Sequence, residues 1–212
     1  EYAHELGLGV STGIELVETT GNMSNAANHM DYAGTEWRIG DTLQAAIGQS
    51  DSVFTPLQLA EYCAAVANNG ERHSASILKS VRSYDYSEQI YDRQDEVLST
   101  VESPQYNWDA IHEGMKEVIN SPLNETNYLN FYDCAVTVAG KTGTAQKGEG
   151  IKNDGLFICY APYEDPEIAV AVVVERGHAG ASVGFIARQI VDVYLNIRSY
   201  SNTSESEMSL LK

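Results

Sequence analysis

The 212-residue sequence lacks the features that mark several large classes of protein. No stretch approaches the roughly eighteen apolar residues of a membrane-spanning helix, and the opening residues 1–4 do not resemble a signal peptide. Glycine-rich phosphate-binding loops are absent, so nothing indicates nucleotide binding. The sequence has only 13 basic residues and 30 acidic ones, and the net charge of −17 argues against nucleic acid or an anionic membrane surface as a partner.

Cysteine is scarce, and the spacing of the cysteines and histidines is typical neither of a disulfide framework nor of a metal site. Cys63, Cys134 and Cys159 lie in apolar surroundings without the spacing of a disulfide framework, so we expect buried free thiols. The five histidines show neither i,i+4 pairing nor Cys-His spacing. The sequence therefore predicts no metal site and no cofactor.

The first half of the sequence contains one helix with clear start and stop signals. Residues 1–50 predict loops, because small residues and Asn cluster there. Thr55 can cap a helix that begins at Pro56, with Gln58 completing a capping box, and the Asn-Gly pair at 69–70 predicts a left-handed stop. The residues expected to face the core are Leu59, Cys63, Val66 and Ala67.

The remaining sequence predicts a sheet and further helices. Short strands joined by charged turns are expected over 74–101, followed by a helix over 108–119. Apolar segments at 134–138, 155–161 and 168–175 predict β-structure, and the last should be a central strand because it is apolar on both faces. No helix separates these segments, so their connections predict antiparallel pairing.

An amphipathic helix is expected after residues 177–180, and it has the length to cover one face of that sheet. Its apolar side is predicted to comprise Val183, Ile186, Ala187, Ile190 and Tyr194. The fold class is therefore α+β, with an antiparallel sheet covered by helices. Residues 198–212 are polar and Ser-rich, and we expect a disordered tail there.

The most informative segment is residues 138–146, Val-Ala-Gly-Lys-Thr-Gly-Thr-Ala-Gln. Lys141 supplies a compact positive charge, and the hydroxyls of Thr142 and Thr144 can donate to a carboxylate. Gly143 leaves the backbone bare, so a ligand can lie alongside it. Lys-Thr-Gly accompanies a Ser-x-x-Lys nucleophile in serine β-lactamases and penicillin-binding proteins. Alone, the triplet would be better explained as an ordinary turn that carries a solvated lysine.

Six blocks, in order, resemble the C-terminal half of the transpeptidase domain of class B penicillin-binding proteins, of the penicillin-binding protein 2 type. The resemblance covers residues 1–197. Two departures are Val-Glu-Thr at 17–19, where the family usually has Pro-Gly-Glu, and Leu156 in place of a common aromatic residue. The blocks are 7–16; 47–50 with 55–60 and 67–70; 113–118; 139–146; 157–162; and 169–175.

The resemblance implies a partial penicillin-binding-protein/β-lactamase-like fold and acyl transfer from D-Ala-D-Ala stem peptides of peptidoglycan. Lys141, Thr142, Gly143 and Thr144 would bind the carboxylate of the stem peptide or of a β-lactam. The backbone N–H of Thr144 would be one oxyanion donor. The family also implies a location at the extracytoplasmic face of the bacterial membrane, with an N-terminal anchoring helix that these residues do not include.

In the family pattern, the Ser-x-x-Lys nucleophile and the Ser-x-Asn motif precede the first matching block. We therefore expect that this chain contains one wall of the active site and is inactive alone. The helix that carries the serine normally packs in the centre of the domain. Its absence should leave apolar surface uncovered and favour self-association.

Two alternatives stay open from the residues. Ser76-Ile-Leu-Lys79 satisfies Ser-x-x-Lys, and a β-lactamase-like hydrolase would use Ser76 as its nucleophile. The surrounding sequence predicts an extended segment, in which side chains three residues apart point to opposite faces. The chain could instead be a non-catalytic module that binds peptidoglycan peptides or another protein.

Overall fold

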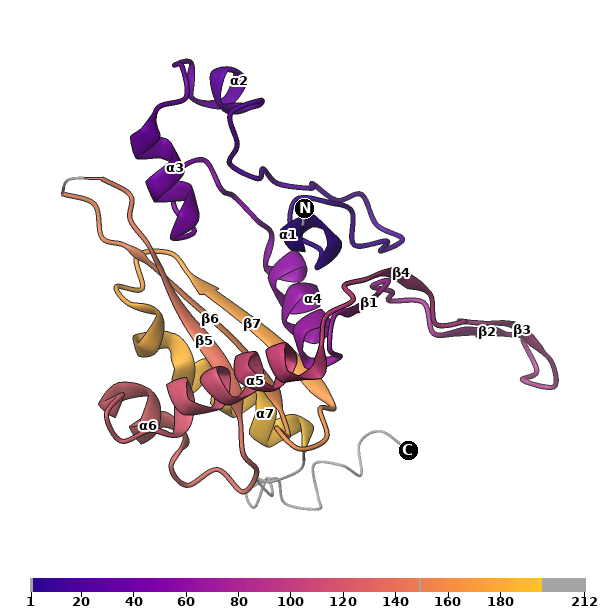
Figure 1. Ribbon diagram of the computed structural model, residues 1–212. Coiled ribbons are helices and arrows are strands. Elements are labelled where there is room, and N and C mark those ends of the chain that lie inside the picture. The colour runs from indigo at the N-terminus through magenta and orange to yellow at the C-terminus, as the bar shows by residue number, and fades with distance from the viewer. Residues whose placement is uncertain (1, 149, 196–212) are drawn as a thin grey trace.

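The computed structural model describes residues 2–148 and 150–195, and a three-stranded antiparallel sheet forms its centre (Figure 1). Strands β5 (Ala139–Ala145), β6 (Asp154–Ala161) and β7 (Ile168–Val174) lie in the order β5-β6-β7. Each pairs with its neighbour in an unbroken antiparallel register. The predicted α+β class with an antiparallel sheet is therefore confirmed.

Helices cover both faces of this sheet. On one face, α4 (Pro56–Ala67) and α5 (Gln105–Asn120) pack over a core that contains Cys63 and Tyr160 (Figure 1). On the other face, a larger core joins the sheet to α6 (Glu125–Phe131), the 3-10 turn η1 (Gly180–Val183) and α7 (Gly184–Tyr194). The buried residues of the larger core are Ile119, Phe131, Val138, Phe157, Cys159, Ala161, Val170, Val172, Val183, Ala187 and Val191.

Helix α4 begins and ends where the sequence predicts. The Thr55 hydroxyl accepts from the Gln58 backbone N–H at 3.1 Å, and the Gln58 side chain accepts from the Thr55 N–H at 3.0 Å. Asn69 and Gly70 stop the helix with left-handed φ values of +54° and +93°. Of the four residues expected in the core, Leu59 is the one that remains partly exposed.

The first 50 residues hold more helix than predicted. Three short helices occur: α1 (Tyr2–Glu5), α2 (His29–Ala33) and α3 (Ile39–Ala46). Their apolar side chains do not form a buried stripe, because Ile39 and Leu43 on α3 are 83% and 66% exposed. Helix α3 nevertheless has apolar residues at helical spacing, Ile39, Leu43 and Ala46, so the prediction of loops overlooked a local signal there.

The predicted short strands over 74–101 form two separate ribbons. Strand β1 (Glu71–His73) pairs with β4 (Val97–Thr100), and β2 (Ser80–Arg82) pairs with β3 (Gln89–Asp92), both antiparallel. The β2–β3 hairpin projects away from the rest of the chain (Figure 1).

Two predictions about the sheet were wrong. Residues 134–138 do not form a strand, because β5 begins at Ala139, and the preceding α6 was not predicted. Strand β7 is at an edge of the sheet, and β6 is central. Both faces of β7 are apolar because helices lie on both sides of it: α4 packs on one face and α7 on the other.

Helix α7 covers the sheet as expected, with a different inner face. Ala187 and Val191 are fully buried, whereas Ile190 and Tyr194 are 41% and 50% exposed. The inner face also buries Arg188, whose guanidinium donates to Asp192 and Asp133, both at 2.7 Å. The spacing of apolar residues could not predict that an ion-paired arginine would be part of the buried face.

The predicted tail at 198–212 lies outside the described residues. Within the described part of the chain, no helix is both long and apolar enough to cross a membrane.

Gln58 provides a test of how the fold is held together. Its fully buried amide also donates to the carbonyls of Val10 and Thr20, at 2.7 and 2.9 Å. Gln58→Ala would leave these two carbonyls without a donor and would remove the side chain that accepts from the Thr55 N–H. We therefore expect the free energy of unfolding in urea to fall by about 2–4 kcal/mol. Gln44→Ala, on the exposed surface of α3, should change stability by less than about 0.5 kcal/mol. Equal effects of the two substitutions would contradict this role for Gln58.

Candidate active-site wall

Strand β5 presents the Lys-Thr-Gly-Thr segment at the edge of the central sheet. Lys141 is opposite Ile158, Thr142 opposite Phe157, and each following residue pairs in step with β6. Within the described residues, β6 is the only strand that pairs with β5. The other edge of β5 is therefore available to a ligand.

The hydrogen bonds of Thr144 reveal which way its backbone points. Its carbonyl accepts from the side-chain amide of Gln49 at 2.9 Å, on the side away from β6. The N–H and C=O of one strand residue point to the same side, so the Thr144 N–H also faces the open edge. The Thr144 hydroxyl accepts from the backbone N–H of Gly180 at 3.3 Å.

The side chains of this segment alternate between the two faces of the sheet. Lys141 follows Ala139 onto the face covered by α4 and α5, and it is exposed at the surface. Its ammonium donates to the Thr142 carbonyl at 2.8 Å. Thr142 and Thr144 lie on the opposite face, toward η1. A ligand that lies along the edge can therefore reach a charge from one face and hydroxyls from the other.

Two positions that hold this strand were not among the predicted site residues. Gln49 was noted within a family block but without a contact, and only the fold brings it to Thr144, 95 positions along the chain. At Gly180, a Cβ atom would lie 2.4 Å from the Gly143 carbonyl oxygen and 2.6 Å from its nitrogen. Only glycine fits this close backbone approach. A glycine beside a predicted helix start suggested no such role.

A pocket of about 420 Å³ borders the open edge. Residues 142–145 form one side, and residues 47–49 form part of another. The rest of the lining is mainly apolar: Leu8, Phe54, Leu59, Tyr62, Leu156 and Ile158. A second apolar pocket, of about 670 Å³ between α1, α4 and α5, shares Tyr62 with the first. Apolar surface thus extends from the β5 edge along α4.

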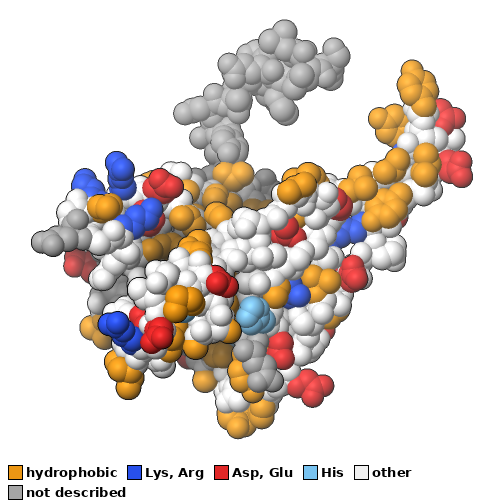
Figure 2. Space-filling model, turned by 90° about the horizontal axis from the view of Figure 1, so that it is seen from above, with side chains coloured by type: hydrophobic (Ala, Val, Ile, Leu, Met, Phe, Trp, Pro, Cys, Tyr) orange, Lys and Arg blue, Asp and Glu red, His pale blue; other side chains and the backbone are white. Residues whose placement is uncertain are grey.

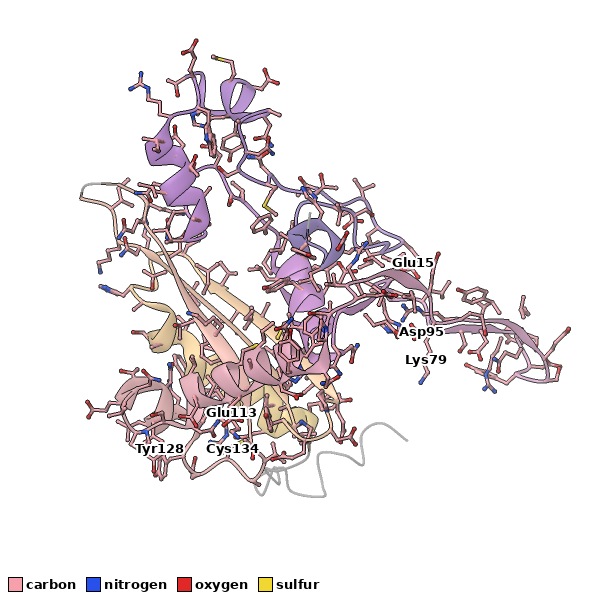
Figure 3. All side chains as sticks on the ribbon, viewed as in Figure 1. Glu15, Lys79, Asp95, Glu113, Tyr128 and Cys134 are labelled. Carbon is pink, nitrogen blue, oxygen red and sulfur yellow. The ribbon has the colours of Figure 1, made fainter. Side chains whose placement is uncertain are left out.

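Ser76 and Lys79 do not lie on one turn of a helix. Residues 76–79 are outside the helices, as predicted, between β1 and β2. The Ser76 hydroxyl donates to the carboxylate of Glu15 and is 3.2 Å from the Leu78 carbonyl. Figure 3 shows Glu15 above this part of the ribbon and Lys79 extending below it. Hydrogen bonds from Ser76 and from the Ile77 N–H lower the pKa of Glu15 to about 2, so this carboxylate remains an acceptor.

A buried ion pair lies behind the pocket and joins α4 to the N-terminal segment. Glu61 is 8% exposed, with one carboxylate oxygen 3.5 Å from the Arg72 guanidinium. Arg72 also donates to the Ser99 hydroxyl at 2.9 Å and to the Ser11 carbonyl at 3.1 Å. The second oxygen of Glu61 has no hydrogen-bond partner among the described residues. Burial outweighs the attraction of Arg72 and raises the pKa of Glu61 to about 7.

Within the described residues, no group of three His, Cys, Asp or Glu side chains is placed to hold a metal ion. Cys63 and Cys159 are buried free thiols, as predicted, while Cys134 is partly exposed. Burial raises the pKa of Cys63 to about 12, so this thiol is not a reactive thiolate.

An antiparallel sheet between two helical layers, with Lys-Thr-Gly on an open edge strand, is the arrangement of serine acyl-transfer enzymes that bind penicillin. Residues 1–192 match the family described as penicillin binding protein transpeptidase domain. The chain belongs to this family.

Individual relatives agree with this assignment. The peptidoglycan D,D-transpeptidase MrdA of Haemophilus influenzae is 32% identical, with 93% of this chain and 32% of that protein covered. Penicillin-binding protein 2B of Streptococcus pneumoniae is also 32% identical, with 90% and 28% covered. The chain thus spans about a third of the length of these relatives.

Solved structures confirm the fold. PBP2 of Pseudomonas aeruginosa, in complex with WCK 5153, has a TM-score of 0.76 and 28% identity, covering 91% of this chain and 42% of that one. PBP2 of Helicobacter pylori, in complex with MreC, has a TM-score of 0.74 and 26% identity, covering 92% and 35%.

The raised pKa of Glu61 predicts a pH-dependent stability. Between about 4.5, its ordinary value, and about 7, the folded state retains a proton that the unfolded state loses. The stabilisation from Glu61 is therefore complete below pH 4.5 and is lost as the pH rises through 7. Glu61→Gln removes this penalty, so we expect it to be about 1–3 kcal/mol more stable than the parent chain at pH 8.

Unfolding by urea at pH 4.5, 6 and 8 checks this expectation. The gain from Glu61→Gln should disappear at pH 4.5. The exposed Glu164→Gln serves as the control and should show no such trend. A pH-independent difference between Glu61→Gln and the parent chain would contradict the assigned protonation.

Proposed function

We propose that this chain forms the carboxylate-binding wall of a peptidoglycan D,D-transpeptidase, which transfers the acyl group of D-Ala-D-Ala stem peptides. The observation that carries the proposal is the open edge of β5, where Thr144, with its outward N–H, lines a largely apolar pocket and the exposed Lys141 lies on the same strand. Membership of the family and the names of the relatives support this reaction.

Each residue of the wall has a proposed role that its chemistry fits. The Lys141 ammonium attracts the terminal carboxylate of the stem peptide, or that of a β-lactam. Its present bond to the Thr142 carbonyl is exchanged for the ligand. The hydroxyls of Thr142 and Thr144 orient that carboxylate, and Gly143 lets the peptide backbone lie close.

The Thr144 N–H is proposed as one oxyanion donor. Gln49 and Gly180 fix the strand at this residue from two directions, so the donor is held in place before the substrate arrives. Such a donor contributes about 3–4 kcal/mol to transition-state stabilisation. The second donor would be the N–H of the nucleophilic serine.

We propose that the nucleophile and the Ser-x-Asn motif come from residues outside this chain, and that the chain alone does not catalyse acyl transfer. Ser76 hydrogen-bonds to Glu15 and is not directed at the β5 edge. The chain spans about a third of its relatives' length. The apolar pockets beside β5 and α4 would suit a helix that carries the missing serine.

Uncovered apolar surface is expected to make the isolated chain bind hydrophobic dyes such as ANS and to favour self-association there. The parent protein is proposed to act at the extracytoplasmic face of the bacterial membrane, with its anchor outside these residues. By analogy with the MreC complex of the Helicobacter pylori relative, the parent protein is expected to assemble with a partner protein.

A binding module without catalysis is the second candidate, because an anion-binding strand edge does not itself require a nucleophile. Affinity of the isolated chain for a D-Ala-D-Ala peptide, without an acyl adduct, would favour it.

Benzylpenicillin tests the proposed absence of a nucleophile. Intact-mass spectrometry of this chain after incubation should show no covalent adduct, because no serine is activated at the β5 edge. Ser76→Ala should behave identically. A stoichiometric adduct that maps to Ser76 would overturn the assignment and favour a hydrolase.

Lys141→Ala tests the carboxylate wall. We expect at least a fivefold loss of affinity for a D-Ala-D-Ala peptide, measured by NMR titration, because the charge closest to the ligand carboxylate is removed. Lys152→Ala removes the same charge from an exposed position outside β5 and should leave the affinity within twofold. Equal losses for both variants would indicate a general charge effect.

A further inference from the structure

Residues 22–53 leave the body of the chain and return to it at the same point. The backbones of Asn22 and Val53 exchange two hydrogen bonds, of 2.7 and 2.9 Å, and so close the two ends of this segment. We call it the α2–α3 loop, after the helices that it contains. Figure 1 shows both helices above the end of the sheet. No residue of the loop belongs to either buried core of the described chain.

The α2–α3 loop has almost no interior of its own. Seen from above, many hydrophobic side chains lie at the surface of the molecule (Figure 2), and the exposed apolar residues of the loop include Met30 and Ile47. His29 is the only residue of 22–53 that is buried, with 4% of its surface exposed. The order of the loop therefore depends on the contacts of this one polar side chain.

The imidazole of His29 has contacts on both of its nitrogens. Nδ1 donates to the carboxylate of Asp51, whose side chain is 13% exposed, because a carboxylate offers only acceptors. Nε2 is 3.2 Å from the Thr35 hydroxyl and 3.7 Å from a carboxylate oxygen of Asp41. The Trp37 indole meets the imidazole edge-on, with ring centroids 5.2 Å apart. The ring therefore joins α2 to the segments on both sides of α3.

The bond to Asp51 lies close to the candidate site along the chain. Asp51 follows Gln49 by two positions, and the Gln49 amide donates to the Thr144 carbonyl at the edge of β5. Ser50, between them, has a left-handed φ of +66°, which a residue with a Cβ adopts only where its surroundings hold it. The Asp51 carbonyl also accepts from the Asn22 side chain at 2.8 Å. The segment that carries Gln49 is thus fixed at Asp51.

We propose that His29 is a positioning residue of the carboxylate-binding wall. Through Asp51 it holds Gln49 on the Thr144 carbonyl, and so fixes the Thr144 N–H before a ligand arrives. This role rests on the proposed function of the β5 edge. A donor that is already ordered loses less entropy when the ligand binds. The hydrogen bond of the imidazole, rather than its bulk, is what the site requires.

Two substitutions separate the hydrogen bond from the packing. His29→Asn keeps an N–H donor near the position of Nδ1 but removes the ring, whereas His29→Phe keeps a ring and removes both nitrogens. In NMR spectra of the full chain, His29→Phe should move the side-chain amide resonances of Gln49 toward those of a solvated glutamine. It should also lower the affinity for a D-Ala-D-Ala peptide about fivefold.

His29→Asn should keep the Gln49 resonances near their positions in the parent chain and the peptide affinity within about twofold. Met30→Ala changes the next residue of α2, which is exposed, and serves as the control without effect on either measurement. Far-ultraviolet circular dichroism would establish that the variants remain folded.

Gln49→Ala tests the route by which His29 acts. It should lower the peptide affinity as much as His29→Phe does, and the double variant should show no further loss, because both changes remove the same contact. Asp51→Ala removes the acceptor instead of the donor and should reproduce the effects of His29→Phe. This second variant does not place a new side chain in the buried position.

Three results would overturn the proposal: Gln49 resonances that are unchanged in His29→Phe, an effect of His29→Asn as large as that of His29→Phe, or losses that add in the double variant. The second result would assign His29 a packing role only. A peptide affinity that does not depend on Lys141 would count against the carboxylate wall instead, and the Gln49 resonances would still test the role of His29.

Discussion

The antiparallel pairing of β5 with β6 is the constraint on which the candidate site depends. It runs without a break from Ala139 to Ala145, and it fixes which backbone groups of the Lys-Thr-Gly-Thr segment are used inside the sheet. The remaining groups, at Thr142 and Thr144, must face the open edge because N–H and C=O directions alternate along a strand. A shift of one residue would exchange the two sets. The chemistry proposed for the wall is therefore a consequence of register.

Long-range polar contacts hold this strand and its surroundings in place. Gln49 reaches Thr144 from the segment before α4, and Gln58 ties the start of α4 to two carbonyls of the N-terminal loop. Glu61 and Arg72 join α4, β1 and that same loop behind the pocket. These contacts place polar groups in low-dielectric surroundings. Satisfied hydrogen bonds there favour a single arrangement, whereas a polar atom without a hydrogen-bond partner lowers the stability of the fold. The second carboxylate oxygen of Glu61 is such an atom among the described residues.

The β2–β3 hairpin and the site differ in how each is stabilised. Both faces of the central sheet are covered, and its edge strand β5 is held by side chains from elsewhere in the chain. The hairpin has two strands, exposed apolar residues and no covering layer among the described residues. Pairing an open strand edge with an extended ligand satisfies backbone groups that water otherwise solvates, and this is the physical basis of the proposed ligand-binding edge at β5.

Elements with local signals could be predicted from the amino-acid sequence. The capping box at Thr55 and Gln58 placed the start of α4, and the apolar segments 155–161 and 168–175 identified two strands of the sheet. The Lys-Thr-Gly triplet and the ordered blocks identified the family. The tertiary structure was needed to establish that β6, not β7, is central, because apolar residues on both faces of β7 reflect burial by α4 and α7 and not strand order. It also brought Gln49 and Gly180 to Thr144, contacts set by chain path rather than by spacing.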